Sequence, residues 1–299
     1  MASTNEVYNG LDCIRLSNET VSVWITKSVG LRIIGLSIND NDDLLAFVPE
    51  ARIELPGGED YHLRGGHRLW YAPEKPETTY FPDNQPVETI VGEGRVEQIQ
   101  PVDRSNGIQK SWEIKLGKQS AQIIINHRLS NLGEDPILLA PWAITMLRPG
   151  GVGIFPQQSS PSDEHGLLPN RHLVFWPYTP VDSPYILWWD EAIYVEAKMK
   201  SDALKIGFPN PDGWLAYSID DLLFVKRAAF DQDAEYLDRG ASSEVYCCRD
   251  FIELETLGPT VMLAPRETVE HQEVWEIYTE GNWVEDIFDL YQMYQLAEL

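Results

Sequence analysis

The stretch FIELETLGPTVMLAPRETVEHQEVW, residues 251–275, contains two carboxylates spaced two apart in a strand-like run. Side chains at positions i and i+2 of a β-strand point to the same face. Glu253 and Glu255 therefore share one face, and the apolar Ile252 and Leu254 lie on the other, which we predict to face the core. Because an unpaired buried carboxylate is costly, we expect the acidic face to meet solvent, a pocket or a charged partner.

The rest of the chain favours an all-β architecture. Its 299 residues include 10 Trp, 13 Tyr and 20 Pro, and many short apolar runs alternate with turn residues. The strands are expected within residues 11–49, 87–100, 108–117, 119–130, 185–198, 203–208, 214–219, 222–230 and 243–278. No break in composition and no fixed-period repeat divides the chain, so we expect a single domain over residues 1–299.

Two long segments and the C-terminus depart from this strand pattern. Residues 50–86 and 156–184 are rich in Pro, Gly and polar groups, and loops of that length often carry function. The last residues predict an amphipathic helix, with Asn282 as N-cap and Glu285 as its capping-box partner. The helix is expected either to cover the sandwich or to contact a neighbour. A homodimer is left open on these grounds.

Charge and motif content exclude several classes of function. A formal net charge of −24 disfavours nucleic acids and anionic membranes as partners. No apolar stretch reaches membrane-spanning length, and no secretory signal pattern opens the chain. The three cysteines have neither disulfide-framework nor zinc spacing, and phosphate, dinucleotide and nucleophile-elbow motifs are absent. We therefore expect a cytoplasmic protein with no cofactor and no bound metal.

Donor and aromatic groups gather in the first long segment, in the run Arg64-Gly65-Gly66-His67-Arg68-Leu69-Trp70. The two glycines allow close backbone approach. Arg68 is a fork of donors suited to hydroxyls and carboxylates, and Trp70 offers an aromatic platform beside it. The alternative is a structural Gly-Gly turn whose arginine pairs with one of the many acids.

The second long segment contributes a further set of candidates, namely His165, Arg171, His172 and Trp176. A histidine has a pKa near ~6.5 and can exchange protons at neutral pH, although a loop histidine can equally be a solvated surface residue. His127 is expected to be an ordinary strand residue, and His271 is expected to be exposed in a turn-like stretch.

Two lysines, Lys205 and Lys226, lie in short apolar runs. Each is expected either to pair with Glu253 or Glu255 or to lie on the surface of its strand.

The closing stretch resembles the galactose mutarotase (aldose 1-epimerase) superfamily. Members of that superfamily end with a Leu-Glu-Thr strand, a Pro-Gly-Glu-like turn and a strand carrying a Trp. The matching residues here are Leu254-Glu255-Thr256, Pro265-Arg266-Glu267 and Trp275, with Gly30-Leu31-Arg32-Ile33 and Gly66-His67-Arg68-Leu69 in the N-terminal half. The resemblance extends over the whole chain and implies an antiparallel β-supersandwich with a sugar pocket on a concave face.

The resemblance also implies roles for individual residues. Glu255 would be the general base that removes the anomeric hydroxyl proton, Arg68 would hold sugar oxygens, and Glu253 would be a pocket neighbour. The family's histidine, which protonates the ring oxygen, has no counterpart, because this chain continues with Ala-Pro-Trp-Ala-Ile at 140–144. The candidates for a substitute acid are His67, His165 and His172. The remaining residues expected to bind substrate are Trp70, Arg171, Trp176, Lys205 and Lys226.

Three functions remain open on these grounds. The first is an aldose 1-epimerase or another sugar isomerase that uses a glutamate base. The second is a carbohydrate-binding protein without catalysis, as the missing histidine suggests. The third is the same fold used as an isomerase, lyase or cyclase on a non-sugar ligand. All three imply a small-molecule ligand, which is a saccharide in the first two.

Overall fold

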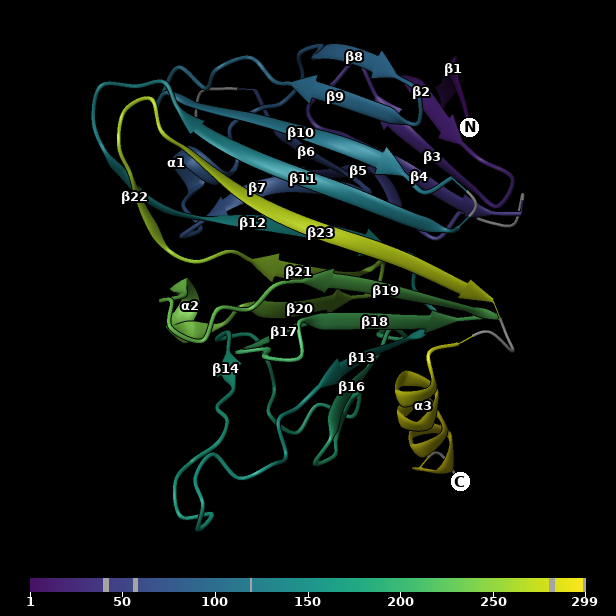
Figure 1. The fold of residues 1–299 in the computed structure, drawn as a ribbon, viewed down its shortest axis with the longest axis vertical. Coiled ribbons are helices and arrows are strands. Elements are labelled where there is room, and N and C mark those ends of the chain that lie inside the picture. The colour runs from purple at the N-terminus through teal and green to yellow at the C-terminus, as the bar shows by residue number, and fades with distance from the viewer. Residues whose placement is uncertain (40–42, 56–58, 119, 280–282, 298–299) are drawn as a thin grey trace.

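Two large antiparallel sheets make up most of the protein (Figure 1). The computed structural model describes residues 1–39, 43–55, 59–118, 120–279 and 283–297. The first sheet runs in the order β1 (Ala2–Tyr8), β2 (Leu11–Ser17), β3 (Val21–Thr26), β4 (Arg32–Ile38), β7 (His67–Ala72), β12 (Ile137–Leu147), β21 (Ile252–Leu257), β20 (Ser243–Cys248), β17 (Ala203–Phe208) and β14 (Val174–Phe175), with β22 (Val261–Leu263) also paired to β12.

The second sheet lies against the first. Its order is β15 (Ile186–Trp188), β16 (Ala192–Glu196), β13 (Val152–Pro156), β18 (Trp214–Ile219), β19 (Leu222–Ala228), β23 (Thr268–Thr279), β11 (Gln122–Asn131), β10 (Ile108–Leu116), β9 (Arg95–Ile99) and β8 (Glu88–Gly92). The main core fills the space between the sheets and is built from apolar residues of both, such as Val23 and Leu254 of the first and Ile125 and Phe224 of the second. The predicted all-β class is therefore confirmed.

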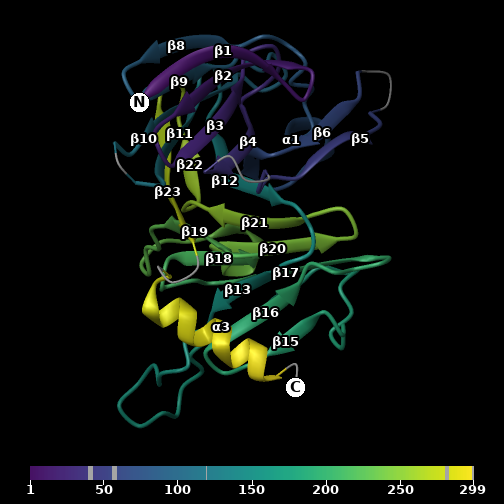
Figure 2. The same ribbon diagram turned by 90° about the vertical axis from the view of Figure 1, so that its right-hand side faces the viewer.

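The alternation of buried and exposed residues along a strand explains which strands were easy to predict. In β11 every second residue is buried, as expected for a strand with one face on the core. By contrast, β3, β4, β7 and β21 are buried on both faces. One face of these strands meets the second sheet. The other face of β7 and β21 packs against a small sheet of β5 (Phe47–Ile53) and β6 (Tyr61–Gly65), which projects from the body in Figure 2. The other face of β3 and β4 packs against Tyr8 and Leu11.

The first long segment differs from its prediction. Residues 50–86 were expected to be an irregular loop, but they contain most of β5, all of β6 and β7, and the short helix α1 (Pro76–Thr79). The charged residues of β7 hide its strand character, because both of its faces are covered and its arginine and histidine are buried. The polar edge strand β1 was also not predicted; it is mostly exposed.

A second short helix, α2 (Leu237–Gly240), and a C-terminal helix, α3 (Glu285–Ala297), complete the fold. Ile287 and Tyr294 of α3 pack on the outer face of the second sheet, against residues such as Ile154 and Tyr194. Figure 2 shows α3 lying across β13 and β16. The helix therefore covers the sandwich, as one of the two alternatives predicted. The proposed cap Asn282 lies outside the described residues.

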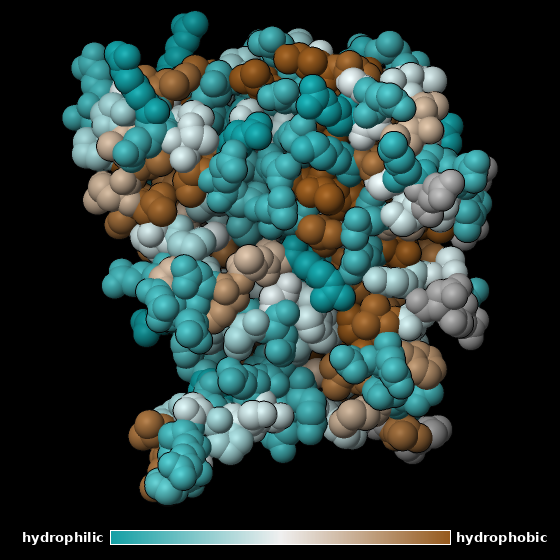
Figure 3. All heavy atoms as spheres, in the orientation of Figure 1, coloured by the Kyte–Doolittle hydropathy of each residue, from teal (hydrophilic) through white to brown (hydrophobic). Residues whose placement is uncertain are grey.

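The surface on the side shown in Figure 3 is largely hydrophilic, with hydrophobic residues in separate patches. This agrees with the high negative charge of the chain. Among the described helices, none has both the length and the apolar character needed to span a membrane.

Candidate functional site

The outer face of the first sheet gathers the acidic candidates through its strand register. Glu255 of β21 pairs with Ile144 of β12 and with Glu244 of β20, while Glu253 pairs with Tyr246 of β20. Residues opposite each other on antiparallel strands project to the same face. The predicted division of β21 into an acidic face and an apolar core face is thus confirmed by the packing.

A cavity of about 400 Å³ opens over this face. Its volume lies within the range typical of small-ligand pockets. The lining residues are mainly aromatic or charged, and they comprise Arg68, Trp70, Glu74, Tyr80, Trp142, Trp176, Tyr178, Lys205, Tyr246, Phe251 and Glu253, with Ile53, Leu63, Ile144 and Ala203. The cavity thus combines flat apolar surfaces with a few charged groups.

Arg68 and Glu253 form the polar part of the cavity wall. The Arg68 Nη2 donates to Glu253 Oε1 at 2.9 Å, and the guanidinium lies 4.1 Å from the centre of the Trp70 ring. Burial raises the pKa of Glu253, and the neighbouring Arg68 offsets part of that rise. Within the described part of the chain, the buried Nε and Nη1 of Arg68 have no hydrogen-bond partner.

Lys205 forms a second charged centre, between two carboxylates and two indoles. Its Nζ lies 2.9 Å from Glu255 Oε2 and 2.7 Å from Glu244 Oε2. The same ammonium lies 4.6 Å from the ring centre of Trp142 and 4.7 Å from that of Trp176. The predicted pairing of Lys205 with Glu255 is therefore present.

The protonation of this centre follows from its charge balance. Burial disfavours the Lys205 cation, but the two carboxylates outweigh it and raise the pKa of Lys205 well above its usual range. Burial also raises the pKa of Glu244 well above its usual range, because one lysine cannot balance two buried carboxylates. The raised pKa of Glu244 favours the neutral form of this carboxyl.

Glu255 itself does not line the cavity. Its side chain is fully buried, and Oε2 accepts from Trp142 Nε1 at 2.7 Å as well as from Lys205. The other oxygen, Oε1, has no hydrogen-bond partner among the described residues. Glu253 is thus the acidic residue of the β21 pair that a ligand in the cavity would meet.

The cavity brings together only part of the predicted site. Arg68, Trp70, Trp176, Lys205 and Glu253 line it. The sequence reasoning missed Tyr80, Tyr246 and Phe251 as lining residues and treated Trp142 only as the replacement for a histidine. The alternation of β20 could have indicated Tyr246, since it lies opposite both Lys205 and Glu253.

Two of the predicted site residues, His67 and Lys226, lie on the core side instead, so their prediction as pocket residues is wrong. His67 follows the alternation of β7 and points away from Arg68, because neighbouring strand residues face opposite ways. Lys226 belongs to the second sheet and pairs with Glu273 at 2.8 Å rather than with either acid of β21.

The predicted residues of the second long segment also lie away from the cavity, apart from Trp176. His165 is exposed in a turn organised by Asp163. Arg171 and His172 line a different hollow, together with Trp188 and Trp189. The irregular backbone of this segment gives no alternation from which those directions could be predicted.

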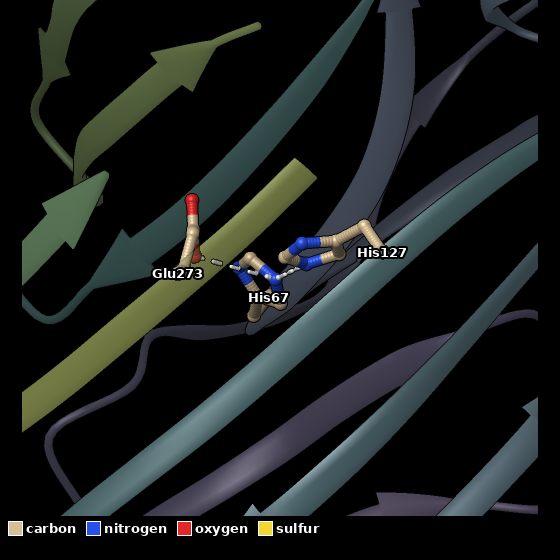
Figure 4. A group of neighbouring side chains, drawn as sticks. All are labelled: His67, His127 and Glu273. Carbon is tan, nitrogen blue, oxygen red and sulfur yellow. Dashed lines mark hydrogen bonds and ion pairs between the residues drawn. The ribbon is translucent and has the colours of Figure 1, made fainter. Parts of the chain in front are cut away.

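A polar network occupies the core between the sheets, where sequence reasoning expected apolar packing. The His67 Nε2 and His127 Nε2 atoms are 2.8 Å apart, and Figure 4 shows Glu273 beside the same pair. His271 was expected to be exposed, but it is buried in β23, where its Nε2 contacts Thr256 Oγ1 at 2.8 Å. Its charged neighbours obscured the strand, in which His271 and Glu273 face inward and Gln272 between them faces outward.

Several solved structures are similar to this protein in fold. A galactose mutarotase-like protein from Lactobacillus casei aligns with a TM-score of 0.60 at 9% identity, over 89% of this chain and 100% of its own. The chain has the galactose mutarotase-like fold. A galactose mutarotase related enzyme from Lactobacillus acidophilus gives 0.55 at 10% identity over 91% and 99% of the two chains. The Slr1438 protein from Synechocystis sp. PCC 6803 gives 0.59 at 11% over 94% and 100%.

These likenesses concern the galactose mutarotase-like fold alone, since sequence identity is low throughout. No protein-family model and no curated protein matches the sequence. Function must therefore be argued from the cavity, because one fold can carry many functions.

Proposed function

We propose that the chain binds a saccharide in the aromatic cavity over β7, β12 and β21. The observation that carries this proposal is the Arg68–Glu253 pair, which lies in the wall of a cavity lined mainly by aromatic rings. Vicinal sugar hydroxyls can accept from the Arg68 guanidinium and donate to the adjacent Glu253 carboxylate. The aromatic rings can stack against the C–H faces of a pyranose.

Calorimetric titration with a panel of mono- and disaccharides at pH 7 tests this proposal. We expect at least one saccharide to bind, and Arg68→Ala to weaken it roughly 10- to 150-fold, because a hydrogen bond to a charged group contributes about 1.5–3 kcal/mol. Arg171→Ala is the matched control, since that arginine lies away from the cavity and should leave affinity unchanged. Failure of every saccharide to bind, or equal affinity of Arg68→Ala, would contradict the proposal.

A second candidate function is interconversion of sugar anomers, and the position of Glu253 favours it. Ring opening requires a base for the anomeric hydroxyl proton and an acid for the ring oxygen. A carboxylate whose pKa is raised by burial is better matched to proton abstraction near neutral pH than an ordinary one. Glu253 would be that base, while Glu255, the base implied by the family resemblance, would hold Lys205 in place. The phenols of Tyr178 and Tyr246 line the same cavity and are the candidate donors of the proton, with pKa values that burial raises.

A coupled mutarotation assay over a panel of aldoses distinguishes the two functions. If the chain is an isomerase, Glu253→Gln should lower turnover by about 10²-fold or more, the usual contribution of a positioned base. Glu255→Gln tests the role implied by the resemblance, and undiminished turnover in both variants would refute a glutamate base. Binding without turnover in the wild type would leave the saccharide proposal standing and remove the isomerase.

A ligand that is not a sugar is the remaining alternative, and a co-purified compound in the cavity would reveal it. The expectations of a cytoplasmic location, and of no nucleic-acid or membrane partner, stay predictions.

A further inference from the structure

The core network contains three potential metal ligands from three different strands. The Nε2 atoms of His67 on β7 and His127 on β11 lie 2.8 Å apart, and His67 Nε2 lies 3.8 Å from Glu273 Oε2 on β23. All three ligand atoms lie within 4.8 Å of one another, and all three side chains are fully buried. Figure 4 shows the two rings and the carboxylate converging between the strands.

Each of these side chains is oriented by a second contact, as metal ligands usually are. The Nδ1 of His127 donates to the backbone oxygen of His271 at 2.9 Å, which leaves its Nε2 lone pair facing the cluster. The Nδ1 of His67 contacts Thr145 Oγ1 at 2.9 Å, and the Nε1 of Trp275 donates to Glu273 Oε2 at 2.9 Å. The ligand atoms therefore already have fixed directions.

We propose that His67, His127 and Glu273 form a binding site for a transition-metal ion of the zinc class. Two imidazoles and one carboxylate are a ligand set that Zn²⁺ accepts, with a fourth position left for a small ligand such as water. Imidazole nitrogens also suit Co²⁺, which makes that ion a usable probe. The ligands lie 60 and more residues apart in sequence, so no spacing motif could have indicated the site.

The two histidines must separate slightly to accept an ion. Nitrogen ligands at about 2.0–2.1 Å in a tetrahedral site are roughly 3.3 Å apart, so the 2.8 Å contact has to open by about half an ångström. In the metal-free protein, His67 donates its Nε2 proton to His127. On binding, His67 changes tautomer, with its proton moving to Nδ1 and facing Thr145 Oγ1, so no net proton is released.

The ammonium of Lys226 should weaken the affinity of this site for a metal ion. This ammonium lies 2.8 Å from Glu273 Oε1 and balances that carboxylate without a metal. A bound cation would be repelled by this lysine. We therefore expect wild-type affinity to be limited by Lys226, and Lys226→Met to bind the ion at least tenfold more tightly, because the ammonium that repels the ion is then absent.

The experiment uses Co²⁺ as the probe. Because the site is fully buried, the full-length protein is unfolded in guanidinium, refolded with Co²⁺ and freed of excess ion. We expect one Co²⁺ per chain, with the visible absorption of a nitrogen-ligated ion. His127→Gln should lose both, whereas His165→Gln, which alters an exposed histidine, should keep both.

Three results would overturn the proposal. They are the absence of bound Co²⁺ in the wild type, an unchanged spectrum in His127→Gln, and an affinity in folded Lys226→Met no higher than that of the wild type. Folding of Lys226→Met only in the presence of Co²⁺ would support the site. If it does not fold in either condition, the comparison of wild type with His127→Gln decides alone.

Discussion

Lys205 carries the charge balance of the proposed saccharide site. It is the described cation closest to both Glu244 and Glu255, and all three side chains are buried. Lys205→Met should therefore destabilise the protein by about 3–5 kcal/mol, because removing one partner leaves an uncompensated buried charge. Urea unfolding measures this change, and Lys115→Met, at a half-exposed surface lysine, should cost about 1 kcal/mol or less.

A double variant distinguishes the contribution of the Lys205 charge to stability from that of its packing. Adding Glu255→Gln to Lys205→Met removes the stranded carboxylate and should restore part of the lost stability. If the double variant is less stable than Lys205→Met, the lysine acts mainly through its packing between the two indoles.

The raised pKa of Glu253 gives the site a pH dependence. Burial lifts this pKa above that of an ordinary glutamate, so Glu253 takes up a proton at a higher pH than usual. Protonation weakens its bond to Arg68 and to ligand hydroxyls, so saccharide affinity should fall as the pH falls below 7 through the range in which this carboxyl takes up its proton. The same proton stabilises the fold, because a carboxyl with a raised pKa favours its neutral form in the folded state.

Titration calorimetry across this pH range checks the dependence. In Glu253→Gln, the decline in affinity on the acid side should be absent, although overall affinity is lower. A decline of the same size in wild type and variant would assign it to another group.

At the scale of the secondary-structure element, Gly66 joins β6 to β7 and so sets where Arg68 lies. Gly66 has a φ of +70°, and a Cβ there would lie 2.1 Å from the backbone oxygen of Ile33. Gly66→Ala should therefore cost several kcal/mol, clearly more than the ~1–2 kcal/mol of an unfavourable φ alone. Gly10→Ala is the matched control, with a φ of +78° and open space around its Cβ.

Urea midpoints of the two alanine variants test this account. Equal destabilisation would show that the close approach of the two backbones can relax. The sequence reasoning expected close approach at this Gly-Gly pair but placed it in a loop rather than before a strand.

Elements with clear alternation could be predicted from sequence, and those whose polar side chains face inward could not. The predicted range for β11 and the acidic face of β21 agree with the structure. In β7 and β23, buried histidines, an arginine and a glutamate resembled loop chemistry. Their burial depends on partners from other strands, which a local pattern does not contain.

At the scale of the whole molecule, sheet order creates the site. Lys205 of β17 reaches Glu255 across β20, and Arg68 of β7 reaches Glu253 across β12. These pairs are 50 and 185 residues apart in the chain, so the sequence could suggest the members but not their pairing. The same order places His67 in the core and Arg68 in the cavity, from adjacent positions. Homodimer formation stays a prediction.

The most direct test of the saccharide proposal is a crystal structure of the protein soaked with the sugar that binds best in the calorimetric panel. We predict electron density for a pyranose in the aromatic cavity, with its hydroxyls against Arg68 and Glu253. Density for the sugar only at another surface, with the cavity free of it, would contradict the proposal.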